Sequence, residues 1–264
     1  MFSIFYNFKT IPFEKSIKKD HLFKSDGIKE FNSRMEYMKQ SRGIILLTGP
    51  SGVGKTTAIR AFIEGLKTEF YRTAYIPLAS VSVSDFYYQL NHLLGGEHYR
   101  VKSVLFASIQ KLILDYATIK KQIPIIIFDE IHFLRNDNLF ELQMLLNFNL
   151  DSLDPAIVVL SGHSHMREKF IRPTLSSINQ RLRVKYEFLP LSNEETFLYI
   201  QHHLNLAGGS SKIFNDNAIN AIYNLSSGII RVINTIATKA LIQGASTKQE
   251  VITEEIIYSI SSEL

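Results

Sequence analysis

The chain has 264 residues, 45% of them hydrophobic and 20% charged, so it can bury the core of an α/β domain and of a smaller second domain. No apolar run approaches the roughly 18 residues of a membrane-spanning helix, and the first residues do not read as a secretory leader. The absence of cysteine excludes disulfides and cysteine-ligated metals, and we expect a soluble, cytoplasmic protein. The balance of 29 Lys+Arg against 25 Asp+Glu is only mildly basic.

Short apolar runs alternate with segments of helical period along the first part of the chain. In chain order, the pattern predicts a strand at Gly43–Thr48, a helix at Thr56–Leu66, a strand at Thr73–Leu78, helices at Ser84–Leu94 and Lys102–Lys120, and strands at Pro124–Phe128, Ala156–Leu160 and Arg183–Leu189. Strands separated by helices form a parallel sheet with helices on both faces. We therefore expect an α/β domain with a parallel five-stranded sheet flanked by helices over residues 1–190.

The strand signals stop after Leu191. Ser192 and Glu195 have the spacing of a capping box, in which each side chain caps the first turn of a helix, here one reaching about Leu206. Further helices are predicted at Asn215–Leu225, Ile229–Ile242 and Thr253–Ile260. Residues 191–264 are thus expected to form a small all-helical lid subdomain.

The segment between the first strand and the first helix has the composition of a phosphate-binding loop. It reads Gly49-Pro50-Ser51-Gly52-Val53-Gly54-Lys55-Thr56-Thr57. Glycines let backbone N–H groups turn towards a phosphate, and the helix N-terminus that follows favours the anion. We expect Lys55 to reach the β- and γ-phosphates and the Thr56 hydroxyl to ligate Mg²⁺. The whole segment is predicted to hold the nucleotide.

An acidic pair, Asp129-Glu130, follows the apolar run Ile125–Phe128. Ligands bind at the carboxyl ends of strands in open α/β sheets, where an aspartate can hold Mg²⁺. Glu130 is placed to polarise the attacking water as a general base. Since the chain has no guanine-reading Asn/Thr-Lys-x-Asp motif, we expect ATP rather than GTP.

Three further residues occupy positions that matter in ATPases with a glutamate after the aspartate. His163 follows the strand at Ala156–Leu160, where such enzymes carry a polar sensor of the γ-phosphate; a hydrogen-bonded structural histidine is an equally good interpretation. Arg231 opens a helix of the tail, which suits a lid arginine that contacts phosphates. Arg181 precedes the last strand, where an arginine can stabilise transition-state charge on the neighbouring subunit's nucleotide.

Together these features resemble the AAA+ superfamily, and within it the ExeA/GspA-like ATPases and the transposition helpers of the TniB/TnsC type. The motifs that carry the resemblance are Phe8–Phe13 (FKTIPF), Ile45–Thr57 (ILLTGPSGVGKTT), Asn179–Leu182 (NQRL), Leu189–Thr196 (LPLSNEET) and Ser227–Asn234 (SGIIRVIN). Two departures are His163-Ser164, where the family has Gly-Gln-Pro-Glu, and Ile230, where it has proline before the lid arginine.

The resemblance implies properties that the residues alone do not. The N-terminal box at 5–23, with Pro12 and Phe13, is expected to pack near the adenine. The transposition helpers form ATP-dependent rings or filaments on duplex DNA and recruit or stimulate a transposase, and we expect the same partners here. A soluble ExeA-like motor that acts on a protein assembly is the alternative, and a STAND-type signalling switch ranks last because no receptor or effector domain is evident.

Candidate DNA contacts come from the segments that face the pore in DNA-threading relatives. These are Ser80–Asp85, the loop Phe133–Asp137 and the basic turn Arg100–Ser103. The individual candidates are Ser84, Arg100, Lys102 and Arg135, although solvated loops explain each of them equally well. Hydroxyl and basic contacts to phosphates would give binding without sequence preference and with strong salt dependence.

Overall fold

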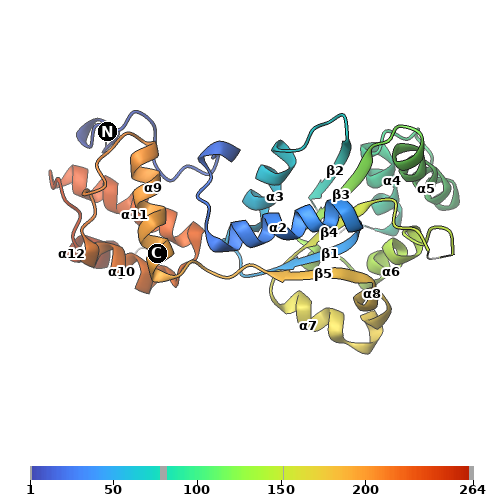
Figure 1. The fold of residues 1–264 in the computed structure, drawn as a ribbon. Coiled ribbons are helices and arrows are strands. Elements are labelled where there is room, and N and C mark those ends of the chain that lie inside the picture. Colours follow the sequence, from blue (N-terminus) through green and yellow to red (C-terminus); the bar gives the residue numbers. More distant parts are fainter. Residues whose placement is uncertain (1, 78–81, 151, 262–264) are drawn as a thin grey trace. The chain divides into compact units, whose positions relative to one another are not determined.

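The computed structural model describes residues 2–77, 82–150 and 152–261 of the chain (Figure 1). Two compact units can be separated: a sheet unit of residues 28–49 and 55–188, and a helical unit of residues 1–27, 50–54 and 189–264. The chain thus passes from one unit to the other four times, and two of these passages lie within the phosphate-binding loop. The domain boundary expected at 190/191 stays a prediction; residues 1–27 and 50–54, expected with the sheet, group with the helical unit.

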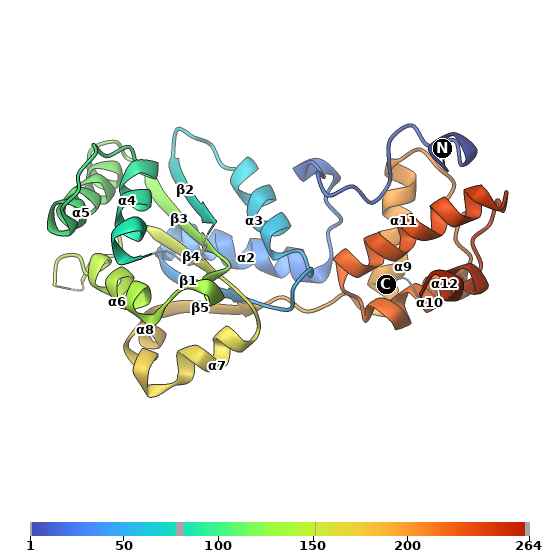
Figure 2. The same cartoon turned by 180° about the vertical axis from the view of Figure 1, so that it is seen from behind.

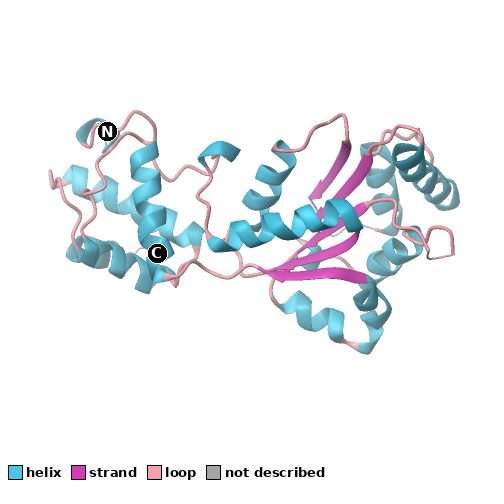
Figure 3. Ribbon diagram, viewed as in Figure 1, coloured by secondary structure: helices cyan, strands magenta, loops and turns pink. Residues whose placement is uncertain are grey.

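The sheet unit contains five strands and the helices that flank them (Figure 3). Its elements are α2 (Asp26–Ser41, whose first two residues belong to the helical unit), β1 (Gly43–Thr48), α3 (Lys55–Glu64), β2 (Tyr71–Pro77), α4 (Val83–Leu93), α5 (Lys102–Thr118), β3 (Ile123–Asp129), the 3-10 turn η2 (Ile131–Phe133), α6 (Asn136–Leu145), β4 (Ile157–Ser161), α7 (His165–Ile171), η3 (Pro173–Leu175), α8 (Ser176–Arg181) and β5 (Leu182–Glu187). All strand pairings are parallel, in the order β2-β3-β4-β1-β5. The expected parallel five-stranded sheet is confirmed.

Continuous apolar strands place the sheet at the centre of this unit. Every residue of β1 and β4 is buried, because helices cover both faces of the sheet. One face packs on α4 to α8, where Phe86 of α4 stacks on Phe128 of β3 with ring centroids 5.5 Å apart. The helix α2 crosses in front of the strands in Figure 1, and its Phe31 packs edge-on against Phe62 of α3.

The helical unit has its own core and no strand among its described residues. Its elements are α1 (Phe2–Phe5), η1 (Lys19–His21), α9 (Asn193–Leu206), α10 (Asp216–Ser226), α11 (Ile230–Ser246) and α12 (Glu254–Ser261), which the second view also shows (Figure 2). The predicted capping box is present, since the Ser192 hydroxyl accepts from the Glu195 N–H and the Glu195 carboxylate accepts from the Ser192 N–H. Tyr6 and Phe13 from the N-terminal segment lie buried in the same core as α9 to α12.

Most predicted elements lie within a few residues of their observed bounds, and five of the described α-helices were not predicted. These are α1, α2, α6, α7 and α8. The predicted loop Phe133–Asp137 ends instead in the first turn of α6, which begins at Asn136. Leu78, at the end of the second predicted strand, lies outside the described residues, as do Ser80 and Val81.

Candidate nucleotide-binding and hydrolysis site

The phosphate-binding loop connects β1 to α3, as its sequence predicts. Lys55, the first residue of α3, is only 6% exposed, and its ammonium group donates to the Gly49 carbonyl at 2.8 Å. Gly52 has φ 84°, and a Cβ there would lie 2.8 Å from Cβ of Arg231. Both the backbone conformation and the space therefore require glycine at this position. The side chain of Lys55 folds back along the loop that a phosphate would enter.

Three oxygen-bearing side chains meet at the carboxyl end of β3. The Thr56 hydroxyl donates to Asp129 Oδ2 at 2.8 Å, and the Tyr75 hydroxyl from β2 donates to the same oxygen at 2.9 Å. Asp129 is 2% exposed. Burial and the neighbouring carboxylate Asp129 raise the pKa of Tyr75 far above its usual value, so its hydroxyl remains a donor. The structure thus joins the two residues predicted as metal ligands and adds Tyr75, which sequence reasoning missed.

Glu130 directly follows Asp129, the last residue of β3, and has a left-handed backbone conformation. Its φ of 57° and ψ of 40° lie in the left-handed region, which costs a non-glycine residue about 1–3 kcal/mol. Its N–H donates to Asp129 Oδ1 at 3.0 Å, which ties the two acidic residues together.

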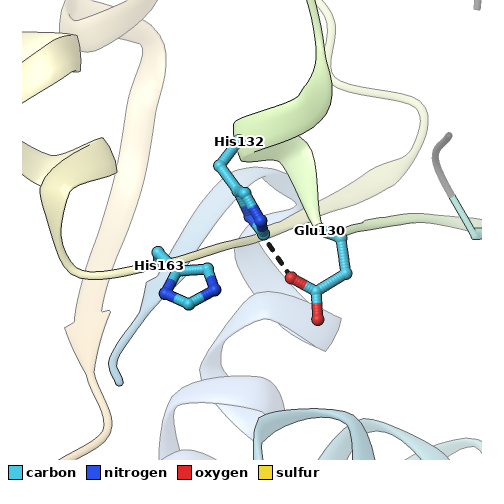
Figure 4. Close-up of side chains that lie close together, drawn as sticks. All are labelled: Glu130, His132 and His163. Carbon is cyan, nitrogen blue, oxygen red and sulfur yellow. Dashed lines mark ion pairs between the residues drawn. The ribbon is translucent and has the colours of Figure 1, made fainter. Parts of the chain in front are cut away.

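Two histidines lie against the Glu130 carboxylate (Figure 4). His132 Nδ1 is 3.2 Å from Glu130 Oε2, and the His163 ring meets the His132 ring edge-on at 4.2 Å. Burial lowers the pKa of His132, with the charge of His163 adding to this and Glu130 opposing it. The structure therefore places His163, the predicted sensor, beside the predicted base. His132 was not singled out from the sequence.

Arg231 and the loop residues 50–54 belong to the helical unit. The Arg231 N–H donates to the Gly52 carbonyl at 3.0 Å, and its guanidinium donates to the Ser51 hydroxyl at 3.3 Å. Arg231 is otherwise exposed. The predicted lid arginine thus lies at the phosphate-binding loop, where a guanidinium favours anions.

Pro12 and Phe13 are buried in the helical unit, with Phe13 6% exposed. The Phe13 ring stacks on His203 of α9 at a centroid distance of 5.3 Å. The N-terminal box is therefore part of the helical core. Its contact with adenine stays a prediction.

Arg181 ends α8, directly before β5 begins. All strands of the sheet are parallel, so the amino end of β5 and the carboxyl end of β3 lie at opposite ends of the strands. Arg181 is therefore remote from Asp129 of its own chain. Its guanidinium donates to the Gln143 carbonyl at 3.0 Å. A contribution to the site of the same chain is excluded, and action on a neighbouring subunit's nucleotide stays a prediction.

The candidate DNA contacts lie in or directly before the helices α4, α5 and α6. Ser84 is exposed in the first turn of α4, and Arg100 and Arg135 are exposed next to α5 and α6. Lys102, the first residue of α5, instead pairs with Glu141 of α6. Its charge is therefore partly used within the chain, which leaves the two arginines as the stronger candidates.

A strand, a glycine-rich loop and a helix, together with an Asp-Glu pair at the carboxyl end of a parallel strand that one further strand separates from the first, define a P-loop nucleoside triphosphatase. Residues 38–170 match the family described as the AAA domain, and this match spans half of the chain. The protein is a member of that AAA domain family.

Among curated proteins, the chain is similar to the General secretion pathway protein A of Aeromonas hydrophila. The two are 30% identical over 245 residues, which make up 92% of this chain and 44% of that protein. The chain therefore spans less than half the length of this relative. The likeness agrees with the ExeA/GspA-like part of the predicted resemblance.

Solved structures confirm the fold at low sequence identity. The Aeropyrum pernix ORC2 protein in its ADPNP–ADP complexes gives a TM-score of 0.69 at 14% identity, over 95% of this chain and 71% of that chain. The Thermotoga maritima RuvB Holliday junction branch migration motor gives 0.62 at 18% identity, over 96% and 73%. Within the described residues, none of the helices has the length and apolar character needed to cross a membrane.

Proposed function

We propose that this protein binds and hydrolyses ATP. The observation that carries the proposal is the convergence of Lys55 and Thr56, at the start of α3, on the same end of the sheet as Asp129 and Glu130. Lys55 supplies a buried ammonium group for the β- and γ-phosphates, and the loop before it supplies backbone N–H groups. ATP is favoured over GTP because the guanine-reading motif is absent.

Mg²⁺ fits the oxygen donors at the end of β3. Thr56 and Asp129 offer a hydroxyl and a carboxylate 2.8 Å apart, and Mg²⁺ prefers such oxygen ligands. When bound, the ion neutralises charge on the phosphates. The Tyr75 hydroxyl fixes the Asp129 carboxylate from the side of β2.

Glu130 is proposed as the general base for the attacking water. Glu130→Gln should keep ATP binding and lower turnover by at least about 100-fold, because general-base catalysis contributes about 10²–10⁴. Glu141→Gln is the matched control, since Glu141 pairs with Lys102 elsewhere in the sheet unit. Persistent single-turnover hydrolysis in Glu130→Gln would show that the base is misassigned.

We propose further that the ATPase works as an oligomer in which Arg181 reaches the nucleotide of the next subunit. The support is that Arg181 lies at the opposite end of the parallel strands from Asp129, so it has no role in the nucleotide site of its own chain. Arg181→Ala should reduce turnover, and mixing it with Lys55→Ala should restore part of it, because mixed interfaces recover one intact site. Arg183→Ala, which removes an exposed arginine paired with Asp154, is the control. Loss of activity without recovery on mixing would contradict action across subunits.

The proposed target is duplex DNA, bound without sequence preference, with a transposase as the partner that the ATPase regulates. The support is the exposure of Arg100 and Arg135, together with the similarity of the fold to that of an ORC1 protein whose structure was solved in complex with DNA. With a non-hydrolysable ATP analogue, filter binding should show affinity that falls steeply with salt, and replacing both arginines by alanine should reduce the salt slope by about 2. Lys212→Ala, at an exposed site of the helical unit, is the control. Affinity that ignores salt and nucleotide would refute this target.

A motor acting on a protein assembly is the second candidate. The 30% identical relative is named as a general secretion pathway protein, and this favours such a target. Nucleotide-dependent assemblies that ignore DNA, observed by electron microscopy, would favour it over the first. A neighbouring gene for a secretion component rather than a transposase would point the same way.

A further inference from the structure

Three potential metal-binding side chains converge beside the proposed ATPase centre. Glu130, His132 and His163 each offer a ligand atom, and these atoms lie within 4.8 Å of one another. Figure 4 shows the two imidazoles and the carboxylate turned towards a common point. They come from two segments, the turn after β3 and the turn after β4, which the parallel pairing of these strands brings together.

The two closest of these atoms have no hydrogen bond of their own. Glu130 Oε2 and His132 Nδ1 are both buried, and neither has a hydrogen-bond partner among the described residues. They face each other at 3.2 Å, a carboxylate oxygen beside an imidazole nitrogen. Buried polar atoms without partners are costly and rare, and an ion held between them would satisfy both.

The chemistry of the three donors selects the ion. Two imidazoles and one carboxylate with an open fourth position are the donor set of Zn²⁺ in catalytic sites, with bonds of about 2.0–2.2 Å. Mg²⁺ prefers oxygen ligands and is served by Thr56 and Asp129. Tetrahedral bonds of this length place ligand atoms about 3.5 Å apart, so the three side chains would have to move closer by about an ångström at the widest gap.

We propose that Glu130, His132 and His163 form a binding site for a transition metal ion of the Zn²⁺ class, separate from the Mg²⁺ site. The proposal rests on the proposed function in one respect: the regulated group is the general base. A Glu130 carboxylate that ligates a metal cannot accept a proton from water. Metal binding at this site therefore stops hydrolysis and leaves ATP binding intact.

Metal binding is tested first, on the full chain without nucleotide. Zn²⁺ titrated in competition with a chromogenic chelator, and Co²⁺ followed by its visible absorption, should each give one equivalent of bound metal. His132→Ala and His163→Ala should each weaken binding at least about tenfold, since each removes one of three ligands. The matched control replaces another pair of stacked imidazoles, His92 in α4 and His98 after it, by alanine. This double variant should bind Zn²⁺ with unchanged affinity. Binding lost in the control variant, or kept in both single variants, overturns the site.

Hydrolysis is measured next, with saturating Mg²⁺ and ATP. Turnover of the wild-type protein should fall over the same Zn²⁺ concentrations that fill the site, and a chelator should restore it, while binding of a fluorescent ATP analogue persists. If ATP turnover is unchanged while Zn²⁺ occupies the site, the proposed inhibitory role of the metal is wrong. If the wild-type protein hydrolyses no ATP at all, the proposed function fails, and the binding experiment still decides the metal site.

Discussion

His203 makes the stability of the helical unit depend on pH. Its imidazole is 5% exposed and lies between Phe13 and Tyr199, with ring centroids 5.3 and 4.4 Å away. Burial lowers the pKa of His203 from 6.5 to about 4, and the charge of the adjacent His202 adds to the shift. The folded protein therefore keeps a neutral imidazole over a pH range in which the unfolded chain binds a proton.

The size and sign of the effect follow from this difference. A depressed pKa contributes stability that is complete above pH 6.5 and is lost as the pH falls towards 4. A shift of about 2.5 units, at 1.36 kcal/mol per unit, corresponds to about 3 kcal/mol of unfolding free energy lost by pH 4. We expect His203→Phe, which keeps an aromatic ring and cannot titrate, to lose much less stability over the same range.

Thermal melts followed by circular dichroism between pH 4 and 7 measure the effect, and NMR titration of the imidazole resonances measures the pKa directly. His92→Gln, which removes an exposed imidazole of the sheet unit, is the control. A pKa of His203 near 6.5, or equal pH dependence in wild type and His203→Phe, would refute the reasoning.

Two further predictions concern the turn before Arg231 and the support of the Asp129 carboxylate, the proposed Mg²⁺ ligand. Gly228→Ala should destabilise the helical unit by at least about 2 kcal/mol in denaturant melts, because φ is 75° and a Cβ would overlap the Leu191 carbonyl oxygen. Gly95→Ala shares the positive φ but has room for its Cβ, and an equal cost in both variants would contradict the steric argument. Tyr75→Phe should raise the Mg²⁺ concentration for half-maximal ATPase activity about tenfold, because groups behind a ligand typically contribute 10–100-fold in metal affinity. An unchanged Mg²⁺ requirement would show that this hydroxyl has no such role.

The strands β1, β3 and β4 were predictable because each is a short apolar run that a buried parallel sheet accommodates, whereas β2 and β5 carry polar residues among their apolar ones. The helix α2 was missed, although its buried residues, Phe31, Met35 and Met38, have the i, i+4, i+7 spacing of an amphipathic helix and the remainder of the helix is polar. The helices α6, α7 and α8 are short, and short helices are held mainly by tertiary packing rather than by a local signal. Local sequence carries little of that information.

The residues of the candidate site likewise fall into those that the local sequence predicts and those that only the structure shows. The loop and the Asp129-Glu130 pair follow from local sequence, because each group acts from a fixed place at a strand end. Tyr75 and His132 became visible only in three dimensions, since the register of β2 with β3 and the turn η2 bring their polar atoms to the acidic pair. The order of the strands in the sheet likewise depends on long-range pairing, which a single sequence does not display.

The edge strand β5 limits how copies of this chain can associate. Its exposed side chains include Arg183 and Lys185, and the Lys185 carbonyl already accepts a hydrogen bond from Arg34 of α2 at 3.3 Å. Positive charge and an occupied backbone acceptor both discourage another strand from pairing along an edge. A second copy that approached β5 would therefore meet it through side chains rather than by extending the sheet at that edge.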